Sequence, residues 1–174
     1  MGTPEIAETC LRRIWEDGHD IAAVYTKPDT PKNRGMKLTA SPVKEFALAH
    51  SLPVCQPPSF REDSVVEALR DLRPELIVVV AYGKILPRRV LDIPEYGCIN
   101  IHASLLPRLR GAGPIQWSIL SGDAETGVTA MYLSEGMDEG DMIDRTAVPI
   151  LDTDTTLTLT DKLAEAGAEL LDRK

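Results

Sequence analysis

The stretch LIVVVA, residues 76–81, decides the fold. It is a continuous apolar run rich in valine, bounded by Pro74 and Gly83. An apolar run without alternation is typical of a parallel strand that is buried on both faces. We therefore expect residues 76–81 to form a central strand of an α/β sheet.

On the amino side of this run, helical and strand patterns alternate. Thr3 can cap a first helix that Gly18 ends, and Ser41 with Pro42 opens a second one. A polar loop of about fifteen residues separates strand from helix there. The expected elements are a helix opening at residues 2–4 and running to 17, a strand over 21–26, a helix over 41–49, a short strand at 54 and a helix over 63–72.

On the carboxyl side the alternation continues. The expected elements are a strand over residues 98–102, a helix over 114–120, a hairpin-like pair of strands over 128–133 and 145–150, and a closing helix over 155–171. Strands that alternate with helices favour an α/β fold with a mainly parallel sheet.

Length and composition limit the function classes. The chain has 174 residues, 43% of them hydrophobic, which suits one soluble domain over residues 1–174. No apolar segment approaches the roughly 20 residues that span a bilayer, so no membrane contact is expected. The cysteines Cys10, Cys55 and Cys98 form no CxxC pair, which favours a reducing cytoplasm. A net charge of −8 means that any contact with nucleic acid must be local.

The start of the chain is unusual for this fold class. A helix after a glycine turn normally follows a strand, and here only Met1 precedes the turn. We interpret this as a chain that lacks the first strand, and we note that Lys174 ends the sequence inside a helix without a stop signal. The alternative is an unusual fold that begins with a helix.

Asn100 and His102 are the first candidates for chemistry. Two positions apart on a strand, their side chains leave from the same face and can converge on one atom. An amide can donate to a developing oxyanion, and an imidazole can donate, accept or shuttle a proton, which suits acyl transfer. Without its surroundings, such a triplet is more often a strand end with a capped turn.

Asp138 lies between Gly136 and Gly140 in an acidic loop. A carboxylate near His102 would orient the ring or assist proton removal from an amine. A solvated acidic turn is the plainer alternative. The oxygen ligands of a calcium loop and the spacing of Cys/His metal sites are both absent from the sequence, so no metal is expected.

Two loops follow strands at the carboxyl edge, where open α/β sheets bind their ligands. Residues 82–87 can offer backbone amides to a flat ligand, and residues 104–107 form a polar-to-apolar turn. An ordinary strand-to-helix connection and a loop whose leucines fill the core are the alternatives.

A third loop is basic in an otherwise acidic chain. Residues 27–44 hold Lys27, Lys32, Arg34, Lys37 and Lys44 against Asp29. Such a patch is either a solvated loop or a contact for an RNA backbone. No DNA-reading motif is present.

With these residues in view, the chain resembles the folate-dependent formyltransferase family. The motifs that carry the resemblance are NIHASLLP at residues 100–107, Gly111, Gly127 and MDEG at 137–140. Further stretches are similar to the branch of that family that acts on methionyl-tRNA: GTPE at 2–5, Arg34-Gly35, Lys37-Leu38, SPVK at 41–44, AYG at 81–83 and GAGPIQW at 111–117. Together these motifs extend over nearly the whole chain.

The resemblance implies a Rossmann-like three-layer fold and transfer of a formyl group from 10-formyltetrahydrofolate to the amino group of initiator methionyl-tRNA, by a monomer without a metal. It implies catalytic roles for Asn100, His102 and Asp138. It implies that the folate contacts are Tyr82, Gly83, Ile85, Leu86, Ser104, Leu105, Leu106, Pro107 and Met137, and that the tRNA contacts are Lys32, Arg34 and Lys37.

The same resemblance implies a C-terminal tRNA-binding domain, for which no residues remain in this sequence. We therefore expect a catalytic domain with weakened tRNA binding. The rival hypotheses are a formyltransferase acting on glycinamide ribonucleotide or a sugar nucleotide, and a non-catalytic folate-binding module. A Rossmann-type dehydrogenase is disfavoured because no GxGxxG follows a strand.

Overall fold

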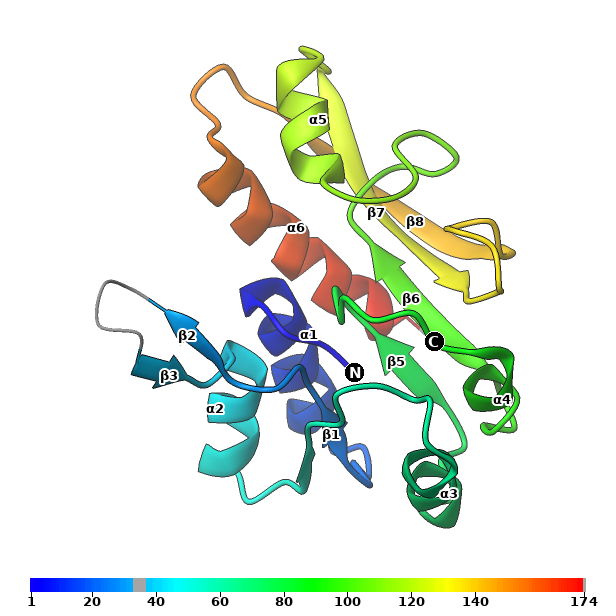
Figure 1. Ribbon diagram of the computed structural model, residues 1–174. Helices are drawn as coiled ribbons and strands as arrows, with labels where there is room; N and C mark the ends of the chain where they lie inside the picture. Colours follow the sequence, from blue (N-terminus) through cyan, green and yellow to red (C-terminus); the bar gives the residue numbers. More distant parts are fainter. Residues whose placement is uncertain (33–36, 174) are drawn as a thin grey trace.

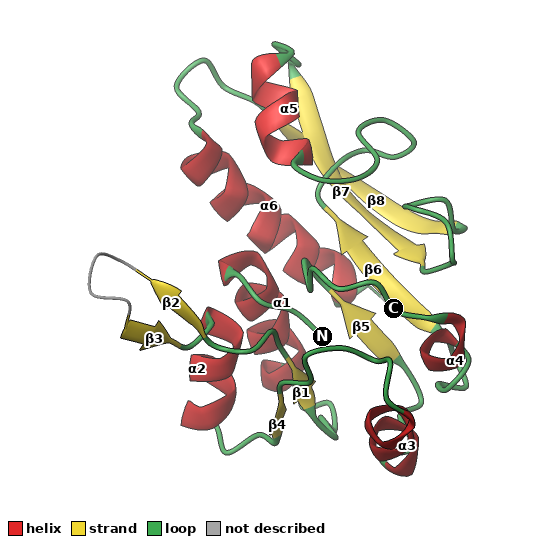
Figure 2. Cartoon of the chain, viewed as in Figure 1, coloured by secondary structure: helices red, strands yellow, loops and turns green. Residues whose placement is uncertain are grey.

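The computed structural model describes residues 1–32 and 37–173. Helices and strands alternate along most of the chain (Figure 2). Their order is α1 (Glu5–Glu16), β1 (Val24–Tyr25), β2 (Thr30–Lys32), β3 (Lys37–Thr39), α2 (Pro42–Ala49), β4 (Val54–Cys55), α3 (Asp63–Asp71), β5 (Ile77–Val79), α4 (Arg88–Leu91), β6 (Cys98–His102), α5 (Pro114–Leu120), β7 (Glu125–Tyr132), β8 (Met142–Pro149) and α6 (Thr156–Leu171).

The main sheet has the order β5-β6-β7-β8 (Figure 1). β5 and β6 are parallel, as β1 and β4 are in their own two-stranded sheet, whereas β7 pairs antiparallel with both β6 and β8. The sheet is therefore mixed and not mainly parallel as expected. The reason is that residues 103–124 stay near the carboxyl end of β6, so β7 starts there and runs back.

Helices cover the strands on two faces, which makes the expected three layers. Val80 and Ile101 pack in one apolar cluster with residues of α1, α2 and α6. Ile77 and Val79 pack in a second cluster with residues of α3 and α4. Because alternate residues of one strand serve opposite clusters, residues 77–80 are covered on both faces as predicted. Leu76 and Ala81 are exposed, however, and β5 is the end strand of the four-stranded sheet and not a central one.

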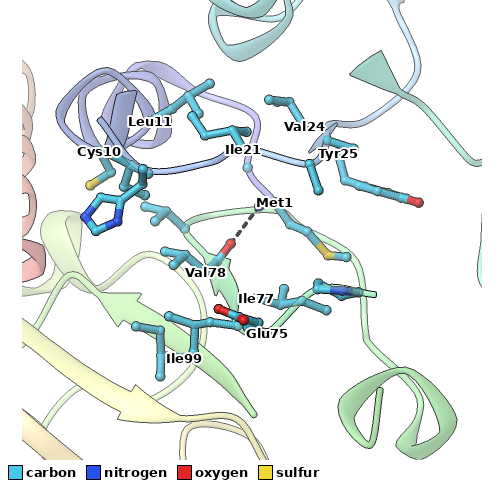
Figure 3. A pocket seen from close by; sticks show the side chains of 18 of the residues that line it. Met1, Cys10, Leu11, Ile21, Val24, Tyr25, Glu75, Ile77, Val78 and Ile99 are labelled. Carbon is cyan, nitrogen blue, oxygen red and sulfur yellow. Dashed lines mark hydrogen bonds between the residues drawn. The ribbon is translucent and has the colours of Figure 1, made fainter. Parts of the chain in front are cut away.

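Met1 and Gly2 occupy the position between β1 and β5. The Gly2 amide donates to Tyr25 O at 2.9 Å, Val80 N donates to Met1 O at 2.9 Å, and the Met1 ammonium donates to Val78 O at 2.6 Å. Beyond these two residues, β1 and β5 border a cavity of about 680 Å³ (Figure 3). Both strands are shorter than expected because neither has a neighbour along this gap.

The cavity between β1 and β5 is lined largely by aliphatic side chains such as Ile21, Leu69 and Ile99. Burial next to it lowers the pKa of the Met1 amine to about 5. Of the described residues that line it, none is a candidate site residue. The size of this cavity therefore does not identify it as the functional site.

Side-chain caps begin two of the helices, α2 and α6. Ser41 Oγ accepts from Lys44 N at 3.1 Å, and Thr155 caps α6 in the same way, as the sequence predicts for Ser41. Thr3 is different, because Pro4 holds the cap position of α1 and Thr3 Oγ1 instead donates to Tyr82 O at 3.2 Å. Thr3 thus joins the start of α1 to the loop after β5.

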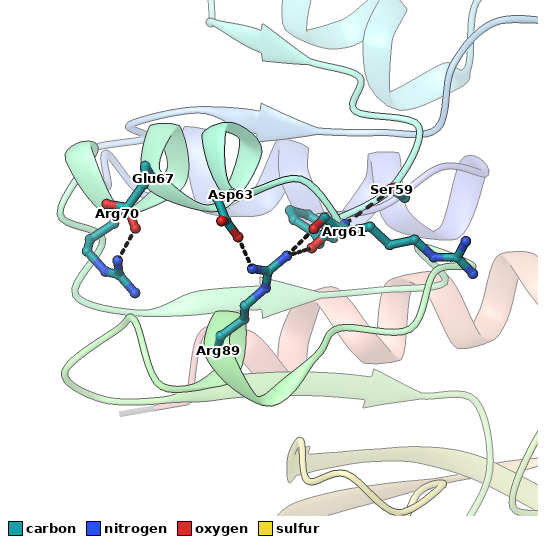
Figure 4. Close-up of polar contacts among 7 residues, drawn as sticks. Ser59, Arg61, Asp63, Glu67, Arg70 and Arg89 are labelled. Carbon is teal, nitrogen blue, oxygen red and sulfur yellow. Dashed lines mark hydrogen bonds and ion pairs between the residues drawn. The ribbon is translucent and has the colours of Figure 1, made fainter.

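Arg89 connects α4 to the start of α3 and to the segment before it (Figure 4). Arg89 of α4 donates to Phe60 O and Arg61 O, both at 2.6 Å, and pairs with Asp63 at the start of α3.

The short helix α4 and the β2–β3 hairpin were not expected from the sequence, because four- and three-residue elements are too short to show a periodic pattern. None of the helices in the described part of the chain combines the length and apolar character needed to cross a bilayer.

Candidate active site

β6 places Asn100 and His102 on one face of the sheet. Asn100 pairs with Met131 and His102 with Thr129 of β7, and alternate positions of a strand point to the same side. The Asn100 side chain is half-buried and makes no hydrogen bond with the residues that the structure describes. Its amide is therefore available to a ligand.

His102 is a buried polar residue with two acceptors around its ring. Nε2 lies 2.9 Å from Leu109 O, and Nδ1 lies 3.6 Å from Asp138 Oδ2. The carbonyl accepts a hydrogen bond from Nε2, and the carboxylate places a negative charge beside Nδ1. The ring is fixed in place while one edge faces a negative charge.

Asp138 comes from the loop between β7 and β8, far along the chain from His102. Its Oδ2 accepts from Gly111 N at 2.8 Å, and its side chain is only 13% exposed. The carboxylate thus joins the loop after β6 to the loop after β7. It is not the solvated turn residue that its local sequence also allowed.

Glycines let these loops approach the sheet. A Cβ on Gly140 would lie 1.8 Å from Tyr132 O, and a Cβ on Gly127 would lie 2.1 Å from Thr146 O and 2.6 Å from Leu105 Cδ2. No larger residue fits either position without moving backbone. The close backbone packing therefore explains why glycine occupies these two motif positions.

Residues 104–107 form a turn whose side chains point mostly into the protein. Ser104 is 1% exposed, with its hydroxyl donating to Arg108 O at 2.7 Å, and Leu106 is equally buried, with its amide donating to Thr129 Oγ1 at 3.1 Å. Leu105 packs on Gly127, and Pro107 is exposed. The side chains of Ser104 and Leu106 support the turn and do not face the open edge.

The loop after β5 divides its residues between the core and the surface. The Tyr82 ring is 1% exposed and packs near Phe60, and Leu86 is buried in the same cluster. Ile85 is 93% exposed, and Gly83 has a φ of +71°. Among the expected folate contacts, the side chains of Tyr82 and Leu86 therefore belong to the core.

Met137 lies beside Gly111, in the same loop as Asp138. Its side chain is 70% exposed, and its Sδ would be 3.2 Å from a Cβ on Gly111. Met137 thus adds an exposed apolar group beside the amide that Asp138 holds.

The basic loop forms the β2–β3 hairpin, which projects from the body of the molecule (Figure 1). Lys32 and Lys37 are directly paired across it, and Arg34 lies outside the described residues. Lys44 and Asp29 form an ion pair at 2.6 Å. The hairpin is separate from the Asn100, His102 and Asp138 group.

Two partners of the site had no signal in the sequence. The carbonyl of Leu109 orients His102, and the Thr129 hydroxyl holds the turn after β6. A backbone carbonyl leaves no mark on residue identity, and Thr129 reads as an ordinary strand residue. Across the described residues, no three His, Cys, Asp or Glu side chains gather as a metal site would require.

Cys98 lies two residues before Asn100 on the same strand, so it is a possible nucleophile by position. Burial raises the pKa of its thiol to about 11. A neutral, buried thiol is a poor nucleophile. The chemistry therefore rests on the amide, the imidazole and the carboxylate.

Comparison with known proteins identifies the family of the chain. The formyl transferase family profile matches residues 1–174. The methionyl-tRNA formyltransferase of Alkaliphilus oremlandii is 51% identical over 171 residues, which is 98% of this chain and 55% of that protein. The chain thus spans about half the length of this curated relative.

Solved structures have the same fold. Phosphoribosylglycinamide formyltransferase from Bacillus halodurans has a TM-score of 0.78 at 28% identity, covering 97% of this chain and 87% of its own. The sugar 3N-formyl transferase WlaRD, crystallised with dTDP and 5-N-formyl-THF, has a TM-score of 0.72 at 22% identity, covering 98% and 58%. Because the family profile matches residues 1–174, the chain belongs to the formyl transferase family.

Proposed function

We propose that this protein transfers the formyl group of 10-formyltetrahydrofolate to the α-amino group of methionine on initiator tRNA, in the cytoplasm. The observation that carries the proposal is that Asn100 and His102 lie on one face of β6, with Asp138 of the β7–β8 loop beside His102. The relative that is 51% identical is named for this reaction. The free cysteines suit a reducing compartment.

These residues match what the reaction needs. As the amine adds to the formyl carbon, the formyl oxygen gains negative charge, to which Asn100 can donate and a doubly protonated His102 can supply a positive charge. Asp138 can accept the proton that the amine loses. A new C–N bond forms while the bond from the formyl carbon to the folate nitrogen breaks, and that nitrogen gains a proton.

The accessible residues around the site suit a flat folate ring. Ile85 and Met137 are large apolar side chains that remain 93% and 70% exposed, and Gly83, two positions before Ile85, is exposed as well. Ligand clefts commonly combine apolar walls with backbone donors and acceptors. This supports folate contacts through Gly83, Ile85, Pro107 and Met137, with Tyr82, Leu86, Ser104, Leu105 and Leu106 holding the loops behind them.

The basic residues of the β2–β3 hairpin support the proposal that the acceptor is a tRNA. Lys32 and Lys37 pair across it in a chain whose net charge is −8, so positive charge is concentrated there. Phosphate contacts by lysine and arginine provide most non-specific affinity for nucleic acid. We assign Lys32, Arg34 and Lys37 to the tRNA backbone.

The test is formyl transfer to charged initiator tRNA by the wild type and by His102→Ala. We expect the variant to lose roughly 10²- to 10⁴-fold in rate. His19→Ala, which removes an exposed histidine, is the matched control and should retain the wild-type rate. Equal background rates for the wild type and His102→Ala would identify a binding module instead.

An assay with a second formyl acceptor distinguishes the proposed function from its nearest alternative. The fold similarity to phosphoribosylglycinamide formyltransferase makes glycinamide ribonucleotide the relevant competitor. Transfer to that compound, with none to methionyl-tRNA, would reject the proposed acceptor and keep the site.

A further inference from the structure

The orientation of His102 depends on a backbone carbonyl. Nε2 lies 2.9 Å from Leu109 O, whereas the Asp138 carboxylate is 3.6 Å from Nδ1, beyond hydrogen-bond distance. A carbonyl only accepts, so this contact requires the proton on Nε2. Leu109 therefore selects which ring nitrogen is protonated in the neutral imidazole.

Leu109 is itself in a backbone conformation that needs support. Its φ is +57°, in the left-handed region that non-glycine residues rarely adopt. Such conformations persist only where surrounding contacts hold them. The question is which contact fixes the carbonyl of Leu109.

Ser104 supplies that contact. Its hydroxyl donates to Arg108 O at 2.7 Å and lies 3.4 Å from Leu109 O, and Ser104 is 1% exposed. Thr129 Oγ1 donates to Ser104 O at 2.7 Å, and Thr129 is directly paired with His102 in the sheet. Contacts thus run from Thr129 to Ser104, from the Ser104 hydroxyl to the carbonyls of Arg108 and Leu109, and from Leu109 O to the His102 ring. His102 in turn is the sheet partner of Thr129.

Packing alone does not hold this turn. Ser104, Arg108 and Leu109 line a cavity of about 260 Å³, together with Thr126. Leu109 is only half-buried. With empty space on one side, the position of the Leu109 carbonyl depends on hydrogen bonds more than on side-chain contacts.

We propose that Ser104 is a positioning residue for His102, which acts by holding the Leu109 carbonyl against Nε2 and so fixing the ring and its tautomer. The role in catalysis rests on the proposed formyl transfer, whereas the role in fixing the ring does not. Removing the hydroxyl lowers kcat roughly 10- to 100-fold through misplacement of His102 and leaves both KM values near those of the wild type.

The experiment compares Ser104→Thr with Ser104→Val. The two side chains have the same shape, and only threonine keeps the hydroxyl, so a packing effect appears equally in both. Ser118→Ala is the control, because Ser118 is also fully buried and its hydroxyl also donates to a carbonyl, Ile115 O at 2.8 Å, away from His102.

The first measurement is the nitrogen NMR spectrum of the His102 ring at alkaline pH, where imidazole is neutral. The chain has 3 histidines, so His102→Ala assigns the signal. We expect the Nε2–H form in the wild type, in Ser104→Thr and in Ser118→Ala, and a mixture of tautomers in Ser104→Val. The same tautomer in Ser104→Val as in Ser104→Thr would overturn the proposal.

The second measurement is kcat for the same variants. A loss in Ser104→Val that Ser104→Thr does not show supports the positioning role, and equal kcat values for the pair reject it. If no variant and not even the wild type transfers formyl groups, the proposed function fails, and the NMR result still decides whether Ser104 fixes the ring.

Discussion

Single residues at this site owe their properties to neighbours that are distant in sequence. His102 meets Leu109 O and Asp138, and Asp138 is fixed by the amide of Gly111. The three chemical groups are ordinary side chains, and their convergence makes them a site. Changing one charge without changing its shape should therefore separate chemistry from structure.

Asp138→Asn makes that separation. The amide oxygen of asparagine can still accept from Gly111 N, so the loop stays in place while the negative charge beside His102 is lost. We expect formyl transfer to fall roughly 100-fold or more, with an unchanged melting temperature. Asp152→Asn, at an exposed turn, is the control for charge. A wild-type rate for Asp138→Asn would remove Asp138 from the mechanism.

Cys10 predicts how stability depends on alkaline pH. Burial, and to a lesser degree the charge of Glu165, raises the pKa of its thiol from 9.0 to about 12. Between these two values the unfolded chain releases a proton that the folded chain keeps, so the free energy of unfolding falls as pH rises. The slope from one such group approaches about 1.4 kcal/mol per pH unit.

Urea titrations from neutral to alkaline pH measure this slope. Cys10→Ala should show a shallower decline than the wild type, because its unfolded state has one less group to ionise. Tyr82 contributes in the same direction, since burial raises its pKa to about 12, so a residual decline remains. Identical slopes for the two proteins would show that the Cys10 thiol ionises equally well when folded.

At the scale of elements, hydrogen bonds at the ends of helices and strands set the boundaries. Ser41 begins α2 by accepting from Lys44 N, and the same oxygen lies 2.7 Å from the buried Thr26 Oγ1 next to β1. One side chain therefore caps a helix and joins it to a strand. The sequence predicted the cap, and the contact with Thr26 needed the fold.

Ser41→Ala should lower the free energy of unfolding by roughly 1–2 kcal/mol, because it removes the cap and the hydrogen bond to the buried Thr26 hydroxyl. Chemical denaturation gives the value directly. Ser64→Ala, at an exposed position of α3, should change stability by less than about 0.5 kcal/mol. Equal losses in the two variants would mean that the Ser41 contacts do not stabilise the fold.

At the scale of the whole molecule, the sheet is interrupted between β1 and β5. Val24 and Thr26 donate to β4, whereas Tyr25 alternates to the other side and faces the gap. Ile77 donates to Gly97 O, and Val78 likewise faces the gap, where its carbonyl accepts from Met1. Met1 and Gly2 join β1 to β5 by hydrogen bonds at this point.

Hydrogen exchange should show this interruption residue by residue. We expect the amides of Tyr25 and Val78 to exchange at least ~10-fold faster than those of Val24 and Ile77, their neighbours in the same strands. Because neighbours share any local unfolding, they serve as internal controls. Uniform protection along both strands would indicate that the gap is closed in solution.

The sequence by itself determined most of the local structure, though not α4 or the β2–β3 hairpin, and it determined the candidate chemistry. Periodicity placed β6 and α5 at their observed bounds, and the spacing of Asn100 and His102 put both on one face. These features depend on the geometry of a few consecutive residues, and such geometry is written in residue type and spacing. The family motifs added the roles.

Only the tertiary structure decided which side chains meet. It brought Asp138 to Gly111 across 27 positions of the chain and turned the Tyr82 and Leu86 side chains into the core. It also combined parallel and antiparallel strands in one sheet. It also assigned the Leu109 carbonyl to His102. Such contacts arise from packing between distant segments and from backbone atoms that every residue shares, so no local pattern predicts them.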